Sequence, residues 1–276
     1  MAVHPGAVPP VFGPYLTLWR LVPDGPPVVT HSSDLLPVCR ADGALAMLKI
    51  PREAEERRGS LLMTWWQGDG AARVLAHDVD ALLLERATGQ RSLSAMVREG
   101  RDDEASQTLC AVAAKLHAPR PHPRPDLAPL DHWFRQLAPA AVRYGGILVK
   151  ANAVAQHLLS SQQDIVPLHG DIHHDNVLDF GPRGWLAIDP KGLVGERTFD
   201  FANILRDPED QTAFVVENFG RRSHMLAQAA GVERTRLLQW TLAFAGLSAA
   251  WILDDGDEPT LDLAIAERAA AELSLR

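Results

Sequence analysis

A polar octapeptide followed by a short hairpin constrains this chain more than any other feature. The stretch His169–Asn176 reads HGDIHHDN, with three histidines, two aspartates and one asparagine. After it come a strand-like run, a Gly/Pro turn at Gly181–Gly184, a second strand-like run and then Asp189. Antiparallel pairing brings the start of the first strand beside the end of the second. Asn176 and Asp189 should therefore lie side by side, with Asp171 on the loop entering the same end.

The octapeptide allows three other interpretations. A zinc hydrolase helix places two histidines four residues apart with a glutamate between them; His169 is spaced four and five residues from His173 and His174, but no Glu lies inside. A nucleophile elbow needs G-x-S-x-G, which is absent here. A polar surface turn with local hydrogen bonds remains open on composition alone.

The residues downstream favour a fourth interpretation, phosphoryl transfer. Two carboxylates and an amide oxygen at one point are the hard ligands that hold Mg²⁺ together with substrate phosphates. The order His169, Asp171, Asn176 matches the catalytic-loop pattern H-x-D-x-x-x-x-N of kinases, and Asp189 closes the next strand. Asp171 would then be the base for the acceptor hydroxyl, and Asn176 and Asp189 the Mg²⁺ ligands.

Upstream, Lys49 lies near the end of a hairpin strand, where kinases carry the lysine that contacts the α- and β-phosphates of ATP. A glutamate on the following helix should orient it, with Glu53, Glu55 and Glu56 as candidates. Each residue also has a plain structural interpretation. Asp171 could cap a turn, Lys49 could extend along the surface from a strand end, and the glutamates could form a solvated face.

The sequence motifs resemble those of the aminoglycoside phosphotransferase family. HGDIHHDNV, GWLAIDPKGLVGE, FDFANILRDP and LSAAWILDDGDEP are similar to its streptomycin 6-phosphotransferase and hydroxyurea-resistance branch. The resemblance covers most of residues 44–270. It implies an α+β, bilobal, protein-kinase-like fold with a small β-rich N-lobe and a larger, mostly helical C-lobe. The implied reaction transfers the γ-phosphoryl group of ATP to an alcohol group of a streptomycin-like aminocyclitol antibiotic.

The resemblance also implies further site residues. Glu56 is the favoured partner of Lys49, because Glu-Arg-Arg-Gly echoes the helix of the family. The chain lacks the G-x-G-x-x-G loop of protein kinases, and a Ser-containing turn stands in that place. The implied assignments are phosphate contacts at Ser32 and Ser33, adenine contacts from the backbone of Glu85 to Ala87, and an acceptor-side or phosphate contact at Lys191.

An acidic cluster interrupts the helical sequence pattern of the C-terminal region; it consists of Asp254, Asp255 and Asp257. It is interpreted either as a solvated loop or as a wall that binds the amino or guanidino groups of the acceptor. We expect Asp200, by contrast, to brace the catalytic loop. Two rival functions stay open: a kinase of another small hydroxylated metabolite on the same scaffold, and a non-catalytic nucleotide-binding regulatory module.

Local patterns give a coarse map. Residues 1–87 should form the nucleotide-binding lobe, with a strand over Tyr15–Val22, a hairpin around Asp42-Gly43 and a helix over about Arg52–Trp66. Residues 88–276 should form the catalytic and substrate-binding lobe, with helices near 103–117, 131–143 and 147–162 and helical text from Phe199 onward.

Composition narrows the partners and the compartment. The formal net charge of −8 over 276 residues argues against nucleic acid as the main partner and is compatible with a small cationic substrate. The first residues lack the features of a secretory signal, and no uninterrupted apolar run reaches bilayer length. Two distant cysteines, Cys39 and Cys110, predict neither a disulfide framework nor a zinc site. We therefore expect a cytoplasmic protein without a membrane partner, and a monomer.

Overall fold

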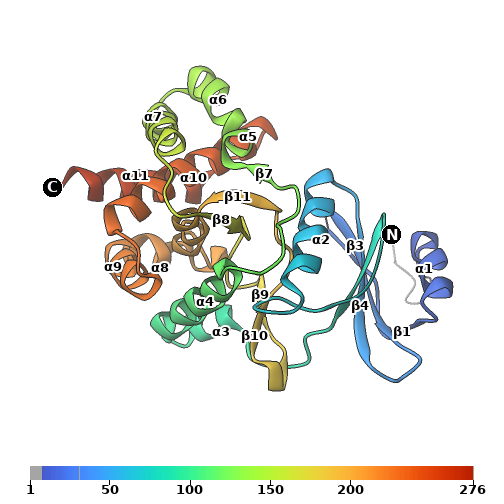
Figure 1. The fold of residues 1–276 in the computed structure, drawn as a ribbon. Helices are drawn as coiled ribbons and strands as arrows, with labels where there is room; N and C mark the ends of the chain where they lie inside the picture. Colours follow the sequence, from blue (N-terminus) through green and yellow to red (C-terminus); the bar gives the residue numbers. More distant parts are fainter. Residues whose placement is uncertain (1–7, 31, 276) are drawn as a thin grey trace.

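An antiparallel six-stranded sheet forms the N-terminal part of the protein, and helices make up most of the rest (Figure 1). The computed structural model describes residues 8–30 and 32–275. The strand order is β1-β3-β4-β6-β5, with β2 also paired to β3. The strands are β1 Val22–Pro23, β2 Val28–Val29, β3 Ser33–Cys39, β4 Leu45–Pro51, β5 Val74–Asp78 and β6 Ala81–Glu85.

The predicted hairpin is present as β3 and β4, in a register that pairs Leu35 with Lys49. Its turn follows the chemistry of the sequence, because Gly43 adopts a φ of +82° and the Asp42 side chain accepts a hydrogen bond from the Ala44 N–H. The register places Lys49 near the end of a central strand. Its ammonium group therefore faces the C-terminal part.

The strand predicted over Tyr15–Val22 is wrong. The segment Gly13–Leu18 is a helix, α1, with Pro14 in its first turn, and only Val22–Pro23 is extended. Tyr15 and Trp19 are four residues apart and their ring centroids lie 5.5 Å from each other, so helical spacing stacks them against the apolar core of the sheet. The loose alternation in the sequence was the helical stripe of a short, partly exposed helix.

Helix α2, Ala54–Trp66, matches the predicted helix and lies between the sheet and the C-terminal part (Figure 1). A Cβ atom on Gly59 would stand 1.9 Å from the carbonyl oxygen of Pro190, and one on Gly192 would stand 2.7 Å from Arg58. The helix can therefore approach the loop after Asp189 only because both positions are glycine. This approach fixes where the acidic first turn of α2 lies.

The C-terminal part holds the remaining helices around a small sheet of order β7-β11-β8 and a separate hairpin of β9 with β10. The 87/88 boundary, which stays a prediction, falls between β6 and the first of these helices. The helices are α3 Leu93–Arg98, α4 Asp102–His117, α5 Leu130–Trp133, α6 Leu137–Tyr144, α7 Ile147–Ser160, α8 Thr212–Glu217, α9 Phe219–Ala230, α10 Arg234–Asp254 and α11 Thr260–Ser274. The strands are β7 Ala128–Pro129, β8 Ile165–Leu168, β9 Val177–Asp179, β10 Trp185–Ala187 and β11 Leu193–Glu196.

Helix α10 is the central helix of this part. By length and composition it passes the test for a membrane span, but 72% of the apolar window is buried against the rest of the protein. Its small and aromatic residues pack against α7, α11 and the helical turns after β11. A continuous run of apolar residues is typical of a helix that is surrounded by other helices.

Candidate active site

The catalytic loop is held in shape by a single buried carboxylate, that of Asp200. One oxygen accepts the backbone N–H of His169 at 2.9 Å and contacts Nε2 of His117 at 2.7 Å, and the other accepts the N–H of Gly170 at 2.7 Å. Asp200 is 2% exposed. It braces the loop, as predicted, by satisfying two amides that would otherwise be buried without acceptors.

His169 is structural and neutral. Its Nδ1 accepts the N–H of Asp171 at 3.2 Å, so Nε2 carries the proton and donates to the carbonyl of Ile188 at 2.8 Å. The ring also stacks on Trp66, with the centroids 6.3 Å apart. Burial lowers the pKa of His169 below its ordinary value, even though Asp200 and Asp171 act in the opposite direction. His169 thus ties the loop to the strand that ends at Asp189.

Three side chains surround the carboxylate of Asp171. Asn203 donates to Oδ1 at 2.9 Å, and Asn176 donates to Oδ2 at 3.4 Å and to the Asp171 backbone carbonyl at 2.9 Å. The ammonium of Lys191 lies 3.7 Å from Oδ2. The side chain of Asp171 remains 27% exposed. It is therefore fixed in orientation and still reachable by a ligand, which is what a positioned base requires.

Asn176 and Asp189 come together through the hairpin. Val177 pairs with Ala187, and the N–H of Ile188 donates to the carbonyl of Asn176 at 2.9 Å. Because the amide nitrogen of Asn176 faces Asp171, its amide oxygen is left to accept a ligand. Asp189 has a φ of +64°, a left-handed conformation that Asp adopts more readily than most residues. The strand end is thereby turned so that its carboxylate faces Lys49.

Lys49 connects the two lobes. Its ammonium contacts the carboxylates of Glu56 and Asp189, and the Lys49 and Glu56 side chains are 8% and 0% exposed. Burial acts to raise the pKa of Asp189, but the ammonium groups of Lys49 and Lys191 outweigh it and hold this pKa below its ordinary value. Asp189 is thus an anion. Of the three glutamates considered in the sequence, Glu56 is the one beside Lys49.

A mostly apolar cavity of about 380 Å³ lies between the lobes, next to Lys49 and Asp189. Ser33, Glu85 and Ala87 line it, together with Lys49 and Asp189. Leu84, Leu178, Phe180 and Ile188 supply apolar walls of the kind that hold a flat heterocycle. The carboxylate of Glu85 does not contribute to these apolar walls, because it pairs with Arg183 and accepts the N–H of Arg73.

Ser32 does not line this cavity. Its backbone carbonyl accepts the N–H of Arg52 at 2.8 Å, which extends the pairing of β3 with β4 by one residue. Ser33 lies inside, 2% exposed, with its hydroxyl 3.5 Å from Glu56. The two serines, grouped as phosphate contacts in the sequence, thus occupy different environments. Their neighbour His31 lies outside the described residues.

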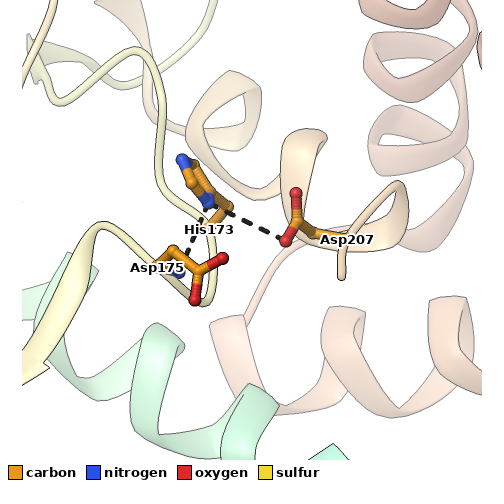
Figure 2. Close-up of side chains that lie close together, drawn as sticks. All are labelled: His173, Asp175 and Asp207. Atoms are coloured by element: carbon orange, nitrogen blue, oxygen red, sulfur yellow. Dashed lines mark hydrogen bonds and ion pairs between the residues drawn. The ribbon is translucent and has the colours of Figure 1, made fainter. Parts of the chain in front are cut away.

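Asp171 does not line this cavity and borders two others. The larger, about 750 Å³, is lined by charged residues of the catalytic loop and of the segment Asn203–Asp210, together with α3. His173, Asp175 and Asp207 line it, and Figure 2 shows His173 between the two aspartates. His173 Nδ1 accepts the backbone N–H of Asp175 at 3.3 Å and lies 3.8 Å from Asp207 Oδ1. The ring lone pair is thus used inside the loop, which does not favour the zinc interpretation.

His174 does not fit the interpretation of the octapeptide as a polar surface turn. It is 1% exposed, and its Nδ1 lies 3.6 Å from Asp207. Burial acts to raise the pKa of Asp207, but the two neighbouring histidines and Arg206 lower it below its ordinary value. The acidic character of this cavity therefore persists at neutral pH.

The comparisons with known proteins agree with this geometry. Residues 18–256 match the family model described as aminoglycoside/hydroxyurea antibiotic resistance kinase. The chain belongs to this family. It is 50% identical over 243 residues to streptomycin 3''-kinase of Klebsiella pneumoniae, an alignment covering 86% of this chain and 91% of the relative. It is 34% identical to streptomycin 6-kinase of Streptomyces griseus over 86% of this chain and 80% of the relative.

The fold is also that of solved phosphotransferases. Aminoglycoside phosphotransferase APH(3'')-Id from Streptomyces rimosus, solved with ADP and streptomycin, has a TM-score of 0.56 and 17% identity over 86% of this chain and 98% of its own. The α+β, bilobal kinase-like fold is thereby confirmed. The family match and the two streptomycin kinases confirm the assignment as an antibiotic-modifying phosphotransferase. Use of ATP follows from the same relatives.

The acidic cluster, interpreted either as a solvated loop or as a substrate wall, lies at the end of α10 and in the turn after it. Asp254 accepts the Tyr144 hydroxyl at 3.0 Å and pairs with Arg143. Asp255 and Asp257 are exposed in the turn after α10. None of the three lines a cavity beside Asp171, although Trp251, one helical turn before Asp254, does. Lys191, in contrast, lies between Glu56 and Asp171.

Two parts of the kinase site escaped the sequence reasoning. Asn203, the partner of Asp171, was hidden inside FDFANILRDP, where Asp200 drew attention as the charged residue. The aromatic pair Trp133 and Trp251 comes from helices 118 residues apart in the chain, and each residue alone looks like core. In the sequence, only the spacing indicated Asn203. It follows Asp200 by three residues, so on a helical turn both side chains can reach the same loop.

Proposed function

We propose that this kinase transfers the γ-phosphoryl group of ATP to a hydroxyl of a streptomycin-like aminoglycoside, and that the acceptor is the 3''-hydroxyl. The observation that carries the proposal is the position of Asp171, whose carboxylate is oriented by two amides and borders both cavities on the side opposite Lys49. The identity of 50% to a streptomycin 3''-kinase, against 34% to a 6-kinase, supports the choice of hydroxyl.

In the proposed reaction a proton leaves the acceptor hydroxyl and a phosphoryl group takes its place. Asp171 accepts the proton of the acceptor hydroxyl as its oxygen forms a bond to the γ-phosphorus, and the bond from that phosphorus to the β,γ-bridging oxygen breaks, releasing ADP. Lys49 contacts the α- and β-phosphates, and Glu56 holds Lys49 in place. Backbone groups of Glu85 to Ala87 face the adenine at the apolar end of the cavity.

The donor set fits Mg²⁺. The free amide oxygen of Asn176 and the anionic carboxylate of Asp189 are hard oxygen ligands at the phosphate end of the cavity. These two residues would hold the ion, which would neutralise charge on the phosphates. Ser33 remains a proposed phosphate contact from the side of Glu56, whereas the geometry gives Ser32 no such support.

For the acceptor, the charged cavity suits a polycationic molecule. Asp175, Asp207, Glu209 and Asp210 stand on its wall with Asp171. Carboxylates at this density attract guanidinium groups, which pair with them in bidentate fashion. Arg98 and Arg206 on the same wall are already paired, with Asp210 and with Asp262 and Glu209. Lys191 is proposed to act at Asp171 and the transferred phosphoryl group.

The decisive experiment incubates the purified protein with ATP, Mg²⁺ and a panel of streptomycin, kanamycin, hydroxyurea, choline and a macrolide. We expect ADP release with streptomycin, a product heavier by one phosphoryl group, and phosphorus coupling to the 3''-carbon in NMR. Turnover of choline or a macrolide alone would select the rival metabolite kinase. Nucleotide binding without ADP release for any acceptor would select the regulatory module.

Expression in a streptomycin-sensitive bacterium tests whether the activity confers resistance. Replacing ATP by GTP tests the nucleotide preference. We further propose a cytoplasmic monomer without nucleic-acid or membrane partners, which light scattering coupled to size exclusion and cell fractionation test directly.

A further inference from the structure

A second, smaller cavity beside Asp171 has a chemistry unlike that of the charged one. It measures about 340 Å³ and is lined by Trp133, Phe244 and Trp251, by the carboxylates of Glu55 and Asp171, and by the cations Arg135 and Lys191. The rings of Trp133 and Trp251 are nearly perpendicular, with an interplanar angle of 79° and centroids 5.4 Å apart. Two aromatic walls at an angle form a corner that packs well against the C–H face of a saturated ring.

The polar groups of this cavity are partly unpaired. The indole N–H of Trp251 donates to the side chain of Gln136. The indole N–H of Trp133 has no acceptor among the described residues, although Trp133 is only 9% exposed. A buried donor left without a partner costs free energy, and a ligand oxygen would recover it where a small movement of the indole exposes the N–H to the cavity. In the proposal this donor favours a hydroxylated ligand.

Glu55 adds a carboxylate at the cavity edge. Burial raises its pKa above the ordinary value, and its nearest cation, Lys191, lies 4.0 Å away and is shared with Glu56 and Asp171. An ammonium group on a ligand would give Glu55 a closer partner than it has within the protein. The cavity thus combines an aromatic corner, a hydrogen-bond donor and an acidic edge.

We propose that this aromatic cavity, lined by Trp133 and Trp251, binds the amino-sugar ring that carries the accepting hydroxyl. The inference rests on the proposed function and assigns the two cavities to different parts of the acceptor. The smaller cavity suits one ring rather than a three-ring antibiotic, whereas the charged cavity of about 750 Å³ takes the guanidino-bearing remainder. Streptomycin has this division, because its 3''-hydroxyl stands on a methylamino sugar distant from the two guanidino groups.

In this arrangement each group has a named partner. The sugar packs against Trp251 and Phe244, a ring oxygen or hydroxyl accepts from Trp133, and the methylammonium approaches Glu55. Asp171 borders both cavities, so a hydroxyl on the bound ring reaches the base while the rest of the molecule passes to the acidic wall. The aromatic cavity thereby selects which hydroxyl reacts.

The test uses Trp133→Phe, which removes the N–H and keeps an aromatic ring, and Trp251→Leu, which removes one wall. Trp65→Phe is the control, because Trp65 contacts His122 and Arg120 outside both cavities. We expect the KM for streptomycin to rise about tenfold in Trp133→Phe and more in Trp251→Leu, with the KM for ATP unchanged. A streptomycin KM within twofold of wild type in both folded variants would overturn the proposal. Trp251→Phe serves if Trp251→Leu does not fold.

A binding measurement separates this inference from the proposed function. N-methylglucosamine and streptidine are titrated separately into the full chain, and tryptophan fluorescence is followed. N-methylglucosamine should quench the wild-type signal, and the quenching should be at least fivefold weaker in Trp133→Phe. This outcome supports the subsite even where streptomycin is not turned over. Quenching by streptidine alone, or equal quenching in wild type and Trp133→Phe, would reject it.

Discussion

Asn203 donates a 2.9 Å hydrogen bond to one oxygen of Asp171, while Asn203 in turn accepts from Arg206 at 3.1 Å. Arg206 is itself anchored by Asp262 at 2.6 Å. The orientation of the proposed base thus depends on a chain of contacts that reaches α11. This chain makes Asn203 a positioning residue and gives it a testable signature.

Asn203→Ala should lower kcat by about 10- to 100-fold with little change in nucleotide affinity, because the carboxylate loses its orientation. Asn203→Asp should in addition shift the acidic limb of the kcat/KM pH profile upward, since two adjacent carboxylates disfavour each other's negative charge. Initial rates across pH 5–9 measure both effects. Asn218→Ala, which removes an amide at the start of α9, is the control. An Asn203→Asp profile identical to wild type would show that Asn203 does not act on Asp171.

Asp171→Asn should reduce turnover by about 10²–10⁴-fold, the usual contribution of a general base, while ATP binds with nearly unchanged affinity. The carboxylate lies on the acceptor side of Asn176 and does not line the nucleotide cavity. Single-turnover rates and calorimetric titration with a non-hydrolysable ATP analogue separate the two quantities. Turnover near the wild-type rate would remove Asp171 from its proposed role.

Asp189→Asn should weaken binding of Mg²⁺-nucleotide by at least tenfold and leave Mg²⁺-free nucleotide binding less affected. Asn is preferred to Ala for this test because it tolerates the φ of +64° at this position. The amide keeps the shape of the side chain and removes its anionic charge. Titrations at several Mg²⁺ concentrations measure the effect, and equal losses with and without Mg²⁺ would contradict it.

Asp200→Ala should lower the free energy of unfolding by about 3 kcal/mol, because two buried backbone N–H groups lose their acceptor. Turnover should fall with it, since the catalytic loop is no longer held. Urea unfolding followed by circular dichroism gives the free energy. Asp126→Ala, on an exposed connection, should change it by less than about 0.5 kcal/mol.

Burial raises the pKa of the Cys110 thiol to about 12. The unfolded chain releases this proton at a lower pH than the folded chain, so Cys110 contributes a loss of stability as pH rises above about 9. At pH 8 a thiol reagent should label Cys39, which is partly exposed, and leave Cys110 unmodified until the protein unfolds. Labelling of both cysteines in the native state at equal rates would contradict this.

The sequence predicted which residues lie together at the centre of the candidate site because these residues are close in the chain. Asp171, Asn176 and Asp189 belong to one loop and one hairpin, so antiparallel pairing alone places the last two together. Lys49 and Glu56 are seven residues apart, and a strand followed by a helix brings them into contact. In these cases the information needed was the spacing of a few residues.

Other features required packing that one stretch of sequence does not contain. Tyr15–Leu18 became helical because two aromatic rings cover the core of the sheet, which overrides a weak strand pattern. The acidic residues from Asp254 to Asp257 were assigned to the acceptor by charge alone. Their position depends on where α10 ends relative to α6, and Tyr144 and Arg143 from α6 engage Asp254.

The two oxygens of Glu56 serve two lysines: one contacts Lys49, and the other accepts from Lys191 at 3.1 Å. Since Lys191 also lies 3.7 Å from Asp171, a single carboxylate on α2 stands between the groups assigned to the two substrates. Occupation of one side must redistribute charge on the other. The affinities for nucleotide and antibiotic should therefore be thermodynamically linked, each raising or lowering the other by the same factor, and Glu56→Gln should bring that factor closer to one.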